Sequence, residues 1–383
     1  MVTRTPRTPR IAIAGGGTGG HLFPALAAVE RIRERSPCAR FLFHATPRDA
    51  AMAGGPARAA GGAGIDLEVI DAPRIDGRSA DRALFPLRFA RAVVAALRSH
   101  RRFRPDCVIG LGGYGSVPSI LAAKLLGRPV VLLEQNAVPG KANRALARLA
   151  DAVGVAFAEA AAPFGARAEL TGNPVRRSLL GRTPDHAAFG LDPARPVLAV
   201  VGGSLGARAL NRAMAAEAPE IARRGIQVIH TTGAGDAAEV RAAYAAAGVA
   251  AFVAPFVADM GAVWATADLA LCRAGGTTVA ELAATRLPAV LVPLTIHADR
   301  HQVRNAESRV IRGGAVLLRE CALDPESIRR AVLDRVEDPR ALERMSRAYG
   351  RDQQRGDDAA DRVAGLCLRV ASGGRRRPRG EHA

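Results

Sequence analysis

Short apolar runs alternate with amphipathic stretches along most of the chain. Four or five apolar residues bounded by turn residues predict a buried strand, and apolar residues spaced three or four apart predict a helix. Helices are expected at 86–102, at 118–126 and over most of 324–371. Strand–helix alternation of this kind predicts parallel sheets. The expected strands are 10–14, 41–45, 67–70, 107–111, 129–133, 197–201, 227–231, 250–253, 269–272 and 289–292.

The alternation is interrupted once, near the middle of the chain, and then restarts. The interruption is rich in Pro, Gly and Asp, a composition typical of a linker. A chain of 383 residues is long enough for two domains. We therefore expect an α/β protein with a first domain at 9–174, a linker at 175–195, a second domain at 196–350 and a basic, disordered tail at 372–383.

Three glycine-rich turns follow predicted strands directly, at Gly15–His21, Gly202–Arg208 and Arg273–Glu281. A glycine turn that leads into a helix forms a cradle for phosphate, because free N–H groups and the positive end of the helix dipole face the anion. The first two turns lie about half a chain apart, which favours two Rossmann-like halves over one dinucleotide fold. The first turn lacks GxGxxG spacing, and no acidic residue ends the second strand, so nicotinamide and flavin are disfavoured.

Other residues in these turns allow two interpretations each. His21 begins a helix, where the dipole favours the neutral imidazole that a general base needs, or it only caps the turn. Glu281 can bind a ribose diol, or it can close a capping box on Thr278. The further turn Gly110–Pro118 can hold a second phosphate or can be a plain tight turn.

The net charge of +18 favours an anionic partner such as phosphate, an anionic membrane or nucleic acid. Aromatic residues make up only 4% and are not interleaved with basic ones, so a platform that stacks single-stranded nucleic acid is disfavoured, and no nucleic-acid partner is expected. The helix at 86–102 is interpreted either as a surface helix or as a helix that docks on an anionic bilayer. Its expected core face consists of Leu87, Ala90, Val93, Val94 and Leu97, with Arg88, Arg91, Arg98 and Arg102 beside it.

Several kinds of site and compartment are disfavoured. The five cysteines include no CxxC pair, which predicts a reduced, cytoplasmic protein with Cys107 and Cys272 in its core. No segment reaches the ~18 apolar residues of a membrane span, so membrane contact is expected only at the surface. His297 and His301 have the spacing of two metal ligands on a helix, but no third ligand is evident nearby. Neither a metal nor a cofactor is expected.

Seven motifs occur in an order that is highly specific when taken together. On these motifs the chain resembles the MurG family, bacterial transferases that move N-acetylglucosamine from UDP-N-acetylglucosamine to lipid I, the undecaprenyl-diphosphate-linked muramyl-pentapeptide. The motifs are GGTGGH ending at His21, GGY ending at Tyr114, EQN at Glu134–Asn136, GNPVR at Gly172–Arg176, GGSLGA at Gly202–Ala207, the stretch Arg273–Glu281, and DRHQVRNA at Asp299–Ala306.

The resemblance implies a GT-B fold, with two Rossmann-like parallel-sheet domains that face a central cleft. The first domain would bind the acceptor and meet the membrane, and the second would bind the UDP-sugar. The last helix, about 352–371, would pack back on the first domain. The implied reaction is an inverting transfer to the acceptor 4-hydroxyl that forms lipid II in peptidoglycan synthesis. The implied location is peripheral, at the cytoplasmic face of the cell (inner) membrane.

The resemblance also assigns residues, with His21 as the candidate catalytic base. Donor contacts map to Thr18, Gly19, Gly20, Asn136, Arg176, Ser204, Val257, Gly276, Thr277, Thr278, Val279, Ala280, Glu281 and Gln302. The acceptor diphosphate maps to Gly17, Gly113 and Tyr114. The membrane face maps to Leu84, Phe85, Arg88, Phe89 and Arg91.

Two positions depart from the family pattern. The usual GGYVSGP reads GGYGSVP here, so that Gly115 and Val117 have changed places. The usual DRQQ reads DRHQ, with His301 in place of one of two glutamines. Two other classes remain as alternatives. One is a UDP-N-acetylglucosamine 2-epimerase, which shares the architecture and donor, and the other is a non-catalytic lipid or nucleic-acid binder.

Overall fold

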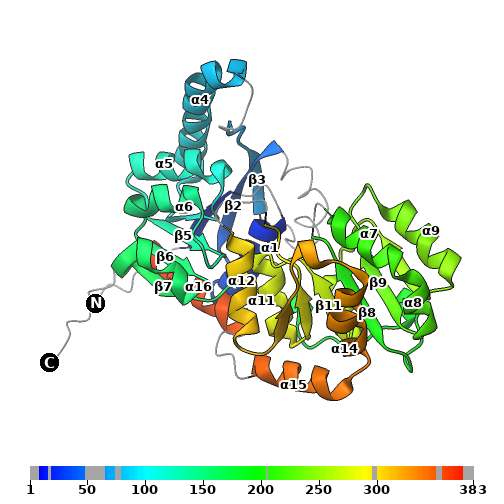
Figure 1. The fold of residues 1–383 in the computed structure, drawn as a ribbon. Helices are drawn as coiled ribbons and strands as arrows, with labels where there is room; N and C mark the ends of the chain where they lie inside the picture. Colours follow the sequence, from blue (N-terminus) through cyan, green and yellow to red (C-terminus); the bar gives the residue numbers. More distant parts are fainter. Residues whose placement is uncertain are drawn as a thin grey trace. The chain divides into compact units, whose positions relative to one another are not determined.

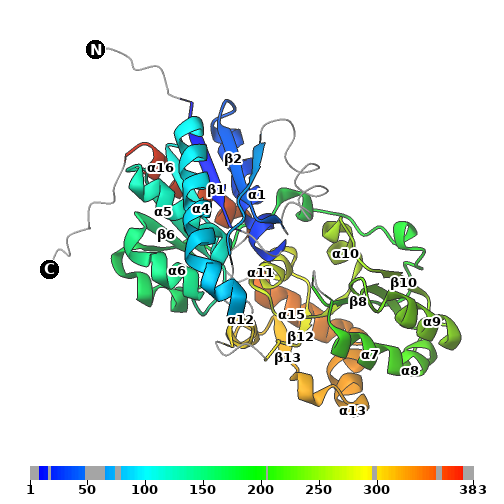
Figure 2. The same ribbon diagram turned by 90° about the horizontal axis from the view of Figure 1, so that it is seen from above.

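The computed structural model describes residues 8–15, 19–47, 65–73, 79–203, 206–295, 300–350 and 356–373. These residues form two compact units. Unit 1 comprises the described residues within Met1–Arg176 and Asp357–Ala383, and unit 2 those within Arg177–Gly356. Both units are drawn in Figures 1 and 2.

Unit 1 is built on one parallel sheet. Its described strands, in spatial order, are β3 (Ile65–Val69), β2 (Arg40–Ala45), β1 (Arg10–Ala14), β4 (Cys107–Gly110), β5 (Val130–Glu134), β6 (Ala152–Val155) and β7 (Ala168–Leu170). Its described α-helices are α1 (Gly19–Arg35), α4 (Ser79–Phe103), α5 (Val117–Leu125), α6 (Lys141–Leu146) and α16 (Gly356–Ala371).

Alternate residues of these strands enter two separate cores, as the period of a strand requires. Ile11 and Ile13 join the core beneath α1 and α16, whereas Ala12 joins the core beneath α4, α5 and α6. A sheet that is buried on both faces needs nearly continuous apolar strands, and this is why the short apolar runs in the sequence identified them.

Helix α16 is tied to unit 1 by both apolar and polar contacts. Val363 and Cys367 are fully buried in the core that also contains α1. The Arg362 Nε group donates to the Thr171 carbonyl oxygen at 2.8 Å. Arg35 and Asp361 form an ion pair of 2.9 Å between α1 and α16.

Unit 2 repeats the architecture with a second parallel sheet. Its described strands, in spatial order, are β10 (Ala251–Ala254), β9 (Gln227–Thr231), β8 (Val197–Val201), β11 (Leu269–Cys272), β12 (Ala289–Leu291) and β13 (Ala315–Leu317). Its α-helices are α7 (Arg208–Ala216), α8 (Ala218–Arg223), α9 (Ala237–Ala247), α10 (Met260–Thr266), α11 (Gly276–Thr285), α12 (His301–Val310), α13 (Pro325–Ile328), α14 (Asp334–Val336) and α15 (Pro339–Gly350).

The predicted core face of the helix at 86–102 is wrong. Helix α4 begins earlier, at Ser79, and continues through Pro86. It buries small and polar residues, including Ala92, Ala96 and His100, while Leu87 is 60% exposed. The buried face is therefore rotated away from the large apolar residues. Its polar members are hydrogen-bonded instead, Ser99 to His44 of β2 and Glu68 of β3, and His100 to Ser119 of α5. No helix in the described part of the chain is long and apolar enough to cross a membrane.

Candidate functional site

In unit 1 the turns that follow β1 and β4 lie side by side. The Leu111 N–H donates to the Ala14 carbonyl oxygen at 2.9 Å. Gly15 has a φ of +111°, and a Cβ built there would lie 2.7 Å from the Gly112 carbonyl oxygen. Glycine is thus required both by the backbone conformation and by the close approach of the second turn. The two glycine turns predicted to face phosphate thus meet at Gly15 and Gly112, at the carboxyl edge of the sheet.

The predicted acceptor and base residues lie at this edge as far as they are described. Gly113 has a φ of 71°, and Tyr114 follows it with 42% of its surface exposed. Gly19, Gly20 and His21 form the first turn of α1, directly beyond the β1 turn. The side chain of His21 and the whole of Gly17, Thr18 and Ser204 lie outside the described residues.

The exchange of Gly115 and Val117 has a steric reason in this chain. A Cβ at Gly115 would lie 2.6 Å from the Thr46 Cγ2 atom, so a valine there would displace Thr46. Val117 instead begins α5 and is only partly buried. The β4 turn therefore depends on Thr46, which follows β2.

A buried carboxylate organises the loop that holds Asn136. Glu134 ends β5 and is 4% exposed. It accepts hydrogen bonds from the Asn136 N–H at 3.0 Å, the Gly140 N–H at 2.9 Å and the Asn143 Nδ2 group at 2.8 Å. A Cβ placed on Gly112 would lie 3.2 Å from the same Asn143 Nδ2 atom, so Asn143 also packs against the β4 turn.

Sequence reasoning missed the role of both residues. Glu134 was recognised only as part of the EQN motif, and Asn143 was not identified at all. An acidic residue that ends an apolar strand is the signal that could have identified Glu134, because a carboxylate at a strand terminus needs buried donors.

Arg176, a predicted donor contact, lies against α1. Its guanidinium carbon is 4.1 Å from the centroid of the Phe23 ring, a cation–π arrangement. Phe23 is two residues beyond His21 on the same helix. The structure thus brings Arg176 to the helix that follows the β1 turn, although their motifs are far apart in the sequence.

In unit 2 the described residues predicted to contact the UDP-sugar follow the carboxyl ends of β10, β11 and β12. These strands belong to one parallel sheet, so the loops after them share one edge. Val257 is partly buried in the loop after β10. The Gln302 Oε1 atom accepts from the Leu294 N–H at 2.9 Å, and the Asn305 Nδ2 group donates to the Ala274 carbonyl oxygen at 3.1 Å. Both contacts hold the start of α12 beside its neighbouring loops.

The turn Arg273–Glu281 is a helix start rather than a capping box. Helix α11 begins at Gly276 with Gly275 as its N-cap, and no side chain caps it. Thr278 and Glu281 both lie inside the helix, so the capping interpretation of Glu281 is wrong. The first turn of α11 carries no acidic residue, and its N–H groups face the edge where an anion would bind. Gly276, Val279 and Ala280 are buried, and Thr277 and Thr278 are partly buried.

Glu281 itself is 7% exposed and is held by a residue that sequence reasoning missed. The Trp264 indole N–H donates to the Glu281 Oε2 atom at 3.0 Å. The two residues lie on different helices, and no local sequence pattern links them. Arg273 is also engaged, since its guanidinium donates to Glu320 at 2.8 Å.

The predicted membrane face is exposed on α4, whose amino-terminal half extends beyond the rest of unit 1 in Figure 1. Leu84 is 47% exposed, and Arg88 and Arg91 are exposed nearby. The Phe85 and Phe89 rings are partly buried and stack on each other at 5.7 Å. Apolar and basic side chains are thus combined on one exposed helix surface.

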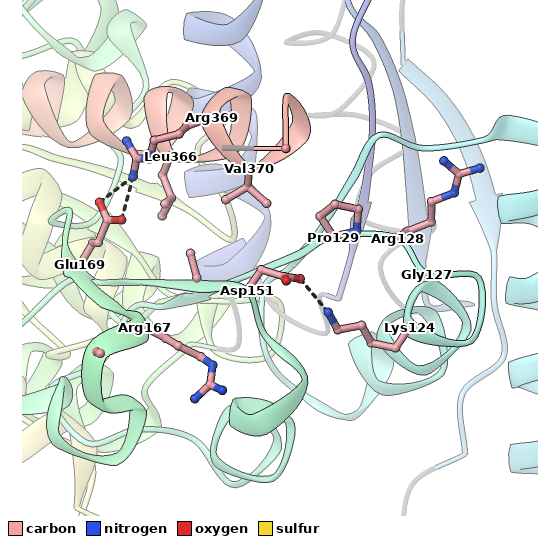
Figure 3. A pocket seen from close by; sticks show the side chains of 13 residues that line it. Lys124, Gly127, Arg128, Pro129, Asp151, Arg167, Glu169, Leu366, Arg369 and Val370 are labelled. Carbon is pink, nitrogen blue, oxygen red and sulfur yellow. Dashed lines mark hydrogen bonds and ion pairs between the residues drawn. The ribbon is translucent and has the colours of Figure 1, made fainter. Parts of the chain in front are cut away.

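Two further observations limit the site. Within the described ranges no group of three or more His, Cys, Asp or Glu side chains could hold a metal, and His297 lies outside those ranges. A cavity of about 390 Å³ lies at the amino ends of β5, β6 and β7, the edge opposite the glycine turns (Figure 3). Ion pairs of Lys124 with Asp151 and of Arg369 with Glu169 line it, but none of the predicted site residues does.

Two α/β units, each with a parallel sheet and glycine turns at its carboxyl edge, form the architecture of the GT-B glycosyltransferases. Residues 11–155 match the glycosyltransferase family 28 N-terminal domain, and residues 197–363 match its C-terminal domain. The chain belongs to glycosyltransferase family 28.

Particular relatives narrow this class. A protein of Anaeromyxobacter sp. (strain Fw109-5), named UDP-N-acetylglucosamine--N-acetylmuramyl-(pentapeptide) pyrophosphoryl-undecaprenol N-acetylglucosamine transferase, is 40% identical over 365 residues, or 94% of this chain and 93% of its own. The crystal structure of Acinetobacter baumannii MurG matches with a TM-score of 0.71 and 29% identity, covering 94% of this chain and 99% of that one. The expected family, fold class and transferase class are confirmed.

A likeness to epimerases extends only to the fold. The UDP-N-acetylglucosamine 2-epimerase of Neisseria meningitidis matches with a TM-score of 0.65, covering 96% of this chain and 100% of that one. Its sequence identity is 10%, which is too low to carry function.

Proposed function

We propose that this chain transfers N-acetylglucosamine from UDP-N-acetylglucosamine to the 4-hydroxyl of lipid I, with inversion, and so forms lipid II for peptidoglycan. The observation that carries this proposal is the 40% identity, over 94% of the chain, with a transferase named for that donor and acceptor. The epimerase alternative lacks comparable support, because its likeness is one of fold alone.

The leaving group of this reaction is a nucleoside diphosphate, on which negative charge grows as the glycosidic bond breaks. Helix α11 is suited to stabilise that charge, because its uncapped N-terminus presents fixed N–H dipoles at Gly276, Thr277 and Thr278. Glu281 would accept hydrogen bonds from the ribose hydroxyls. The other donor contacts in this proposal are Thr18, Gly19, Gly20, Asn136, Arg176, Ser204, Val257, Val279, Ala280 and Gln302.

The acceptor would bind to the glycine turns of unit 1. In this proposal Gly17, Gly113 and Tyr114 face its diphosphate, and His21 removes the proton from the attacking 4-hydroxyl. The position of His21 in the first turn of α1 supports this role, because the helix dipole favours the neutral imidazole that accepts a proton.

The acceptor is a lipid, so the enzyme would work at the cytoplasmic face of the membrane as a peripheral protein. The exposed apolar and basic residues of α4, with Leu84, Phe85, Arg88, Phe89 and Arg91 as the proposed membrane face, support this location. The net charge of +18 would favour an anionic bilayer further.

The experiment that tests the function measures UDP release from UDP-N-acetylglucosamine in EDTA, with and without a soluble lipid I analogue. Release that depends on the acceptor is expected and would also exclude an obligatory metal. Release without acceptor, or formation of the mannosamine epimer, would contradict the proposal in favour of an epimerase.

Two substitutions test the assigned roles. His21→Ala is expected to lower kcat far more than it lowers donor affinity, and equal, small changes in both would remove His21 from the role of base. Glu281→Ala is expected mainly to weaken UDP binding, because it removes an acceptor for the ribose rather than a reacting group.

A further inference from the structure

The hydrogen bond between Trp264 and Glu281 is isolated from solvent. Trp264 is 3% exposed, Glu281 is 7% exposed, and the indole nitrogen lies 3.0 Å from the carboxylate oxygen. An indole N–H only donates, and a bond to an ionised carboxylate in a dry environment is among the stronger neutral–charged hydrogen bonds. This contact therefore fixes the direction in which the Glu281 carboxylate points.

Trp264 is in turn fixed by the way that α10 is anchored. The Asp259 side chain caps the helix by accepting from the Ala262 N–H at 3.2 Å. Within the first turn, a Cβ at Gly261 would lie 2.9 Å from the Ser178 carbonyl oxygen and 3.1 Å from the Leu179 Cα atom. The helix thus lies directly against the backbone of that segment, and its indole has little freedom to shift along the helix axis.

The register of α11 completes the arrangement. Val279 and Leu282 are fully buried on the core side of the helix. The Thr285 hydroxyl donates to the Glu281 carbonyl oxygen at 2.9 Å, one turn further along the helix. With both helices fixed, the orientation of the carboxylate depends on hydrogen bonds such as that from Trp264 rather than on motion of the backbone.

We propose that Trp264 is a positioning residue for the nucleotide, because its N–H holds the Glu281 carboxylate in the orientation that accepts the two ribose hydroxyls. The inference rests on the proposed function, in which Glu281 binds the ribose. It assigns to Trp264 a role in discriminating a ribonucleotide from a nucleotide that lacks those hydroxyls.

The experiment compares the affinities of the full-length protein for UDP and for 2′,3′-dideoxy-UDP, measured by calorimetry. Trp264→Phe keeps a buried aromatic ring but removes the donor. It is expected to weaken UDP binding about tenfold, the scale of one hydrogen bond to a charged group, and to leave dideoxy-UDP binding unchanged. In a Glu281→Ala background, Trp264→Phe is expected to have no further effect, because the two residues act as one unit.

Val263→Ala is the matched control. Val263 is the fully buried neighbour of Trp264 on α10, and its truncation destabilises the same helix without removing a donor. Thermal melting shows whether the two variants are destabilised to a similar extent. Val263→Ala is expected to leave the ratio of the two nucleotide affinities at its unsubstituted value.

The outcomes separate this inference from the proposed function. If Glu281→Ala leaves the ratio of affinities unchanged, the ribose contact itself is wrong. If Glu281→Ala lowers the ratio but Trp264→Phe does not, the contact stands and the positioning role is overturned. If Trp264→Phe weakens both nucleotides equally, as a merely structural residue would, the positioning role is also overturned.

Discussion

The imidazole rings of His44 and His100 stack on each other inside unit 1, with their centroids 4.8 Å apart. The Ser119 hydroxyl lies 3.0 Å from a ring nitrogen of each histidine. His44 also lies 2.7 Å from the Ser99 hydroxyl, which donates to Glu68 at 2.6 Å. This polar cluster joins β2, β3, α4 and α5, and it occupies the place where apolar side chains of α4 were expected.

The cluster predicts that the protein loses stability in mild acid. Burial lowers the pKa of His44 to about 3 and that of His100 to about 4, from an ordinary value of 6.5. Electrostatic interactions with His100 and Arg102 lower the pKa of His44 further. The Ser119 carbonyl and Glu68 partly oppose the lowering of the pKa of His100. As the pH falls, these histidines therefore take up protons in the unfolded chain before they do so in the folded protein. Their contribution to the free energy of unfolding is fully present above pH 6.5 and declines below it.

The free energy of unfolding is expected to fall by about 2 kcal/mol for each of these two histidines between roughly pH 7 and pH 5. Urea unfolding across this range measures it. His44→Gln removes one titrating group. The slope of the unfolding free energy against pH should therefore fall by the contribution of one proton. An unchanged slope would contradict the assignment, whatever the absolute stability of the variant.

Gly15→Ala is expected to disrupt the junction of the two glycine turns in unit 1. The new methyl group would lie 2.7 Å from the Gly112 carbonyl oxygen, at a φ of +111°. Gly127→Ala is the matched control, because Gly127 also has a positive φ, +65°, but has no atom within 4 Å of the added carbon. The control should lose about 1 kcal/mol from backbone strain alone. Gly15→Ala should lower the melting temperature and the initial rate clearly more than Gly127→Ala does. Equal reductions in the two variants would exclude the close approach.

Glu134→Gln is expected to loosen the loop that holds Asn136. The amide of glutamine has one acceptor oxygen, whereas the four donor groups around Glu134 use both carboxylate oxygens. At least one buried donor loses its acceptor, which costs about 1–3 kcal/mol of stability. Because Asn136 is proposed to contact the UDP-sugar, KM for UDP-N-acetylglucosamine should also rise. Glu159→Gln, at an exposed position of unit 1, should change neither quantity.

Leu87→Ser tests the proposed membrane face of α4, because Leu87 is the exposed neighbour of Arg88 in that face. Leu87 is 60% exposed, and burial of a leucine in a bilayer contributes about 1.5–3 kcal/mol. Binding to anionic vesicles, measured by sedimentation, should therefore weaken about tenfold or more. Ile311→Ser, which removes an 85% exposed apolar residue from unit 2, should leave binding unchanged. Equal effects would indicate non-specific adsorption.

The strands were largely predictable because the central strands of each sheet are buried on both faces. The predicted strands 197–201, 227–231 and 269–272 coincide with β8, β9 and β11. The strands that were missed, β6, β7 and β13, contain three or four residues and include Ala, Gly or Glu, so no apolar run marks them. Their pairing with a neighbouring strand forms them, and that pairing is a tertiary effect.

The candidate site was predictable only where the chemistry is local. Glycine turns that precede helices are visible in the sequence, because conformation and spacing act within a few residues. The contacts of Glu281 with Trp264 and of Arg176 with Phe23 join separate elements, and the buried face of α4 depends on partners in β2, β3 and α5. Such contacts follow from the fold and leave no mark in the local pattern.

The division of unit 1 into two chain segments has a consequence for biosynthesis. On the ribosome, the first segment emerges long before α16, because all of unit 2 is translated between them. Until then Ile11, Ile13 and Phe43 lack the apolar partners Val363, Ala364 and Cys367. The nascent chain thus carries an incomplete core while unit 2 can already fold, and a message truncated before α16 would yield a polypeptide open to chaperones and proteases.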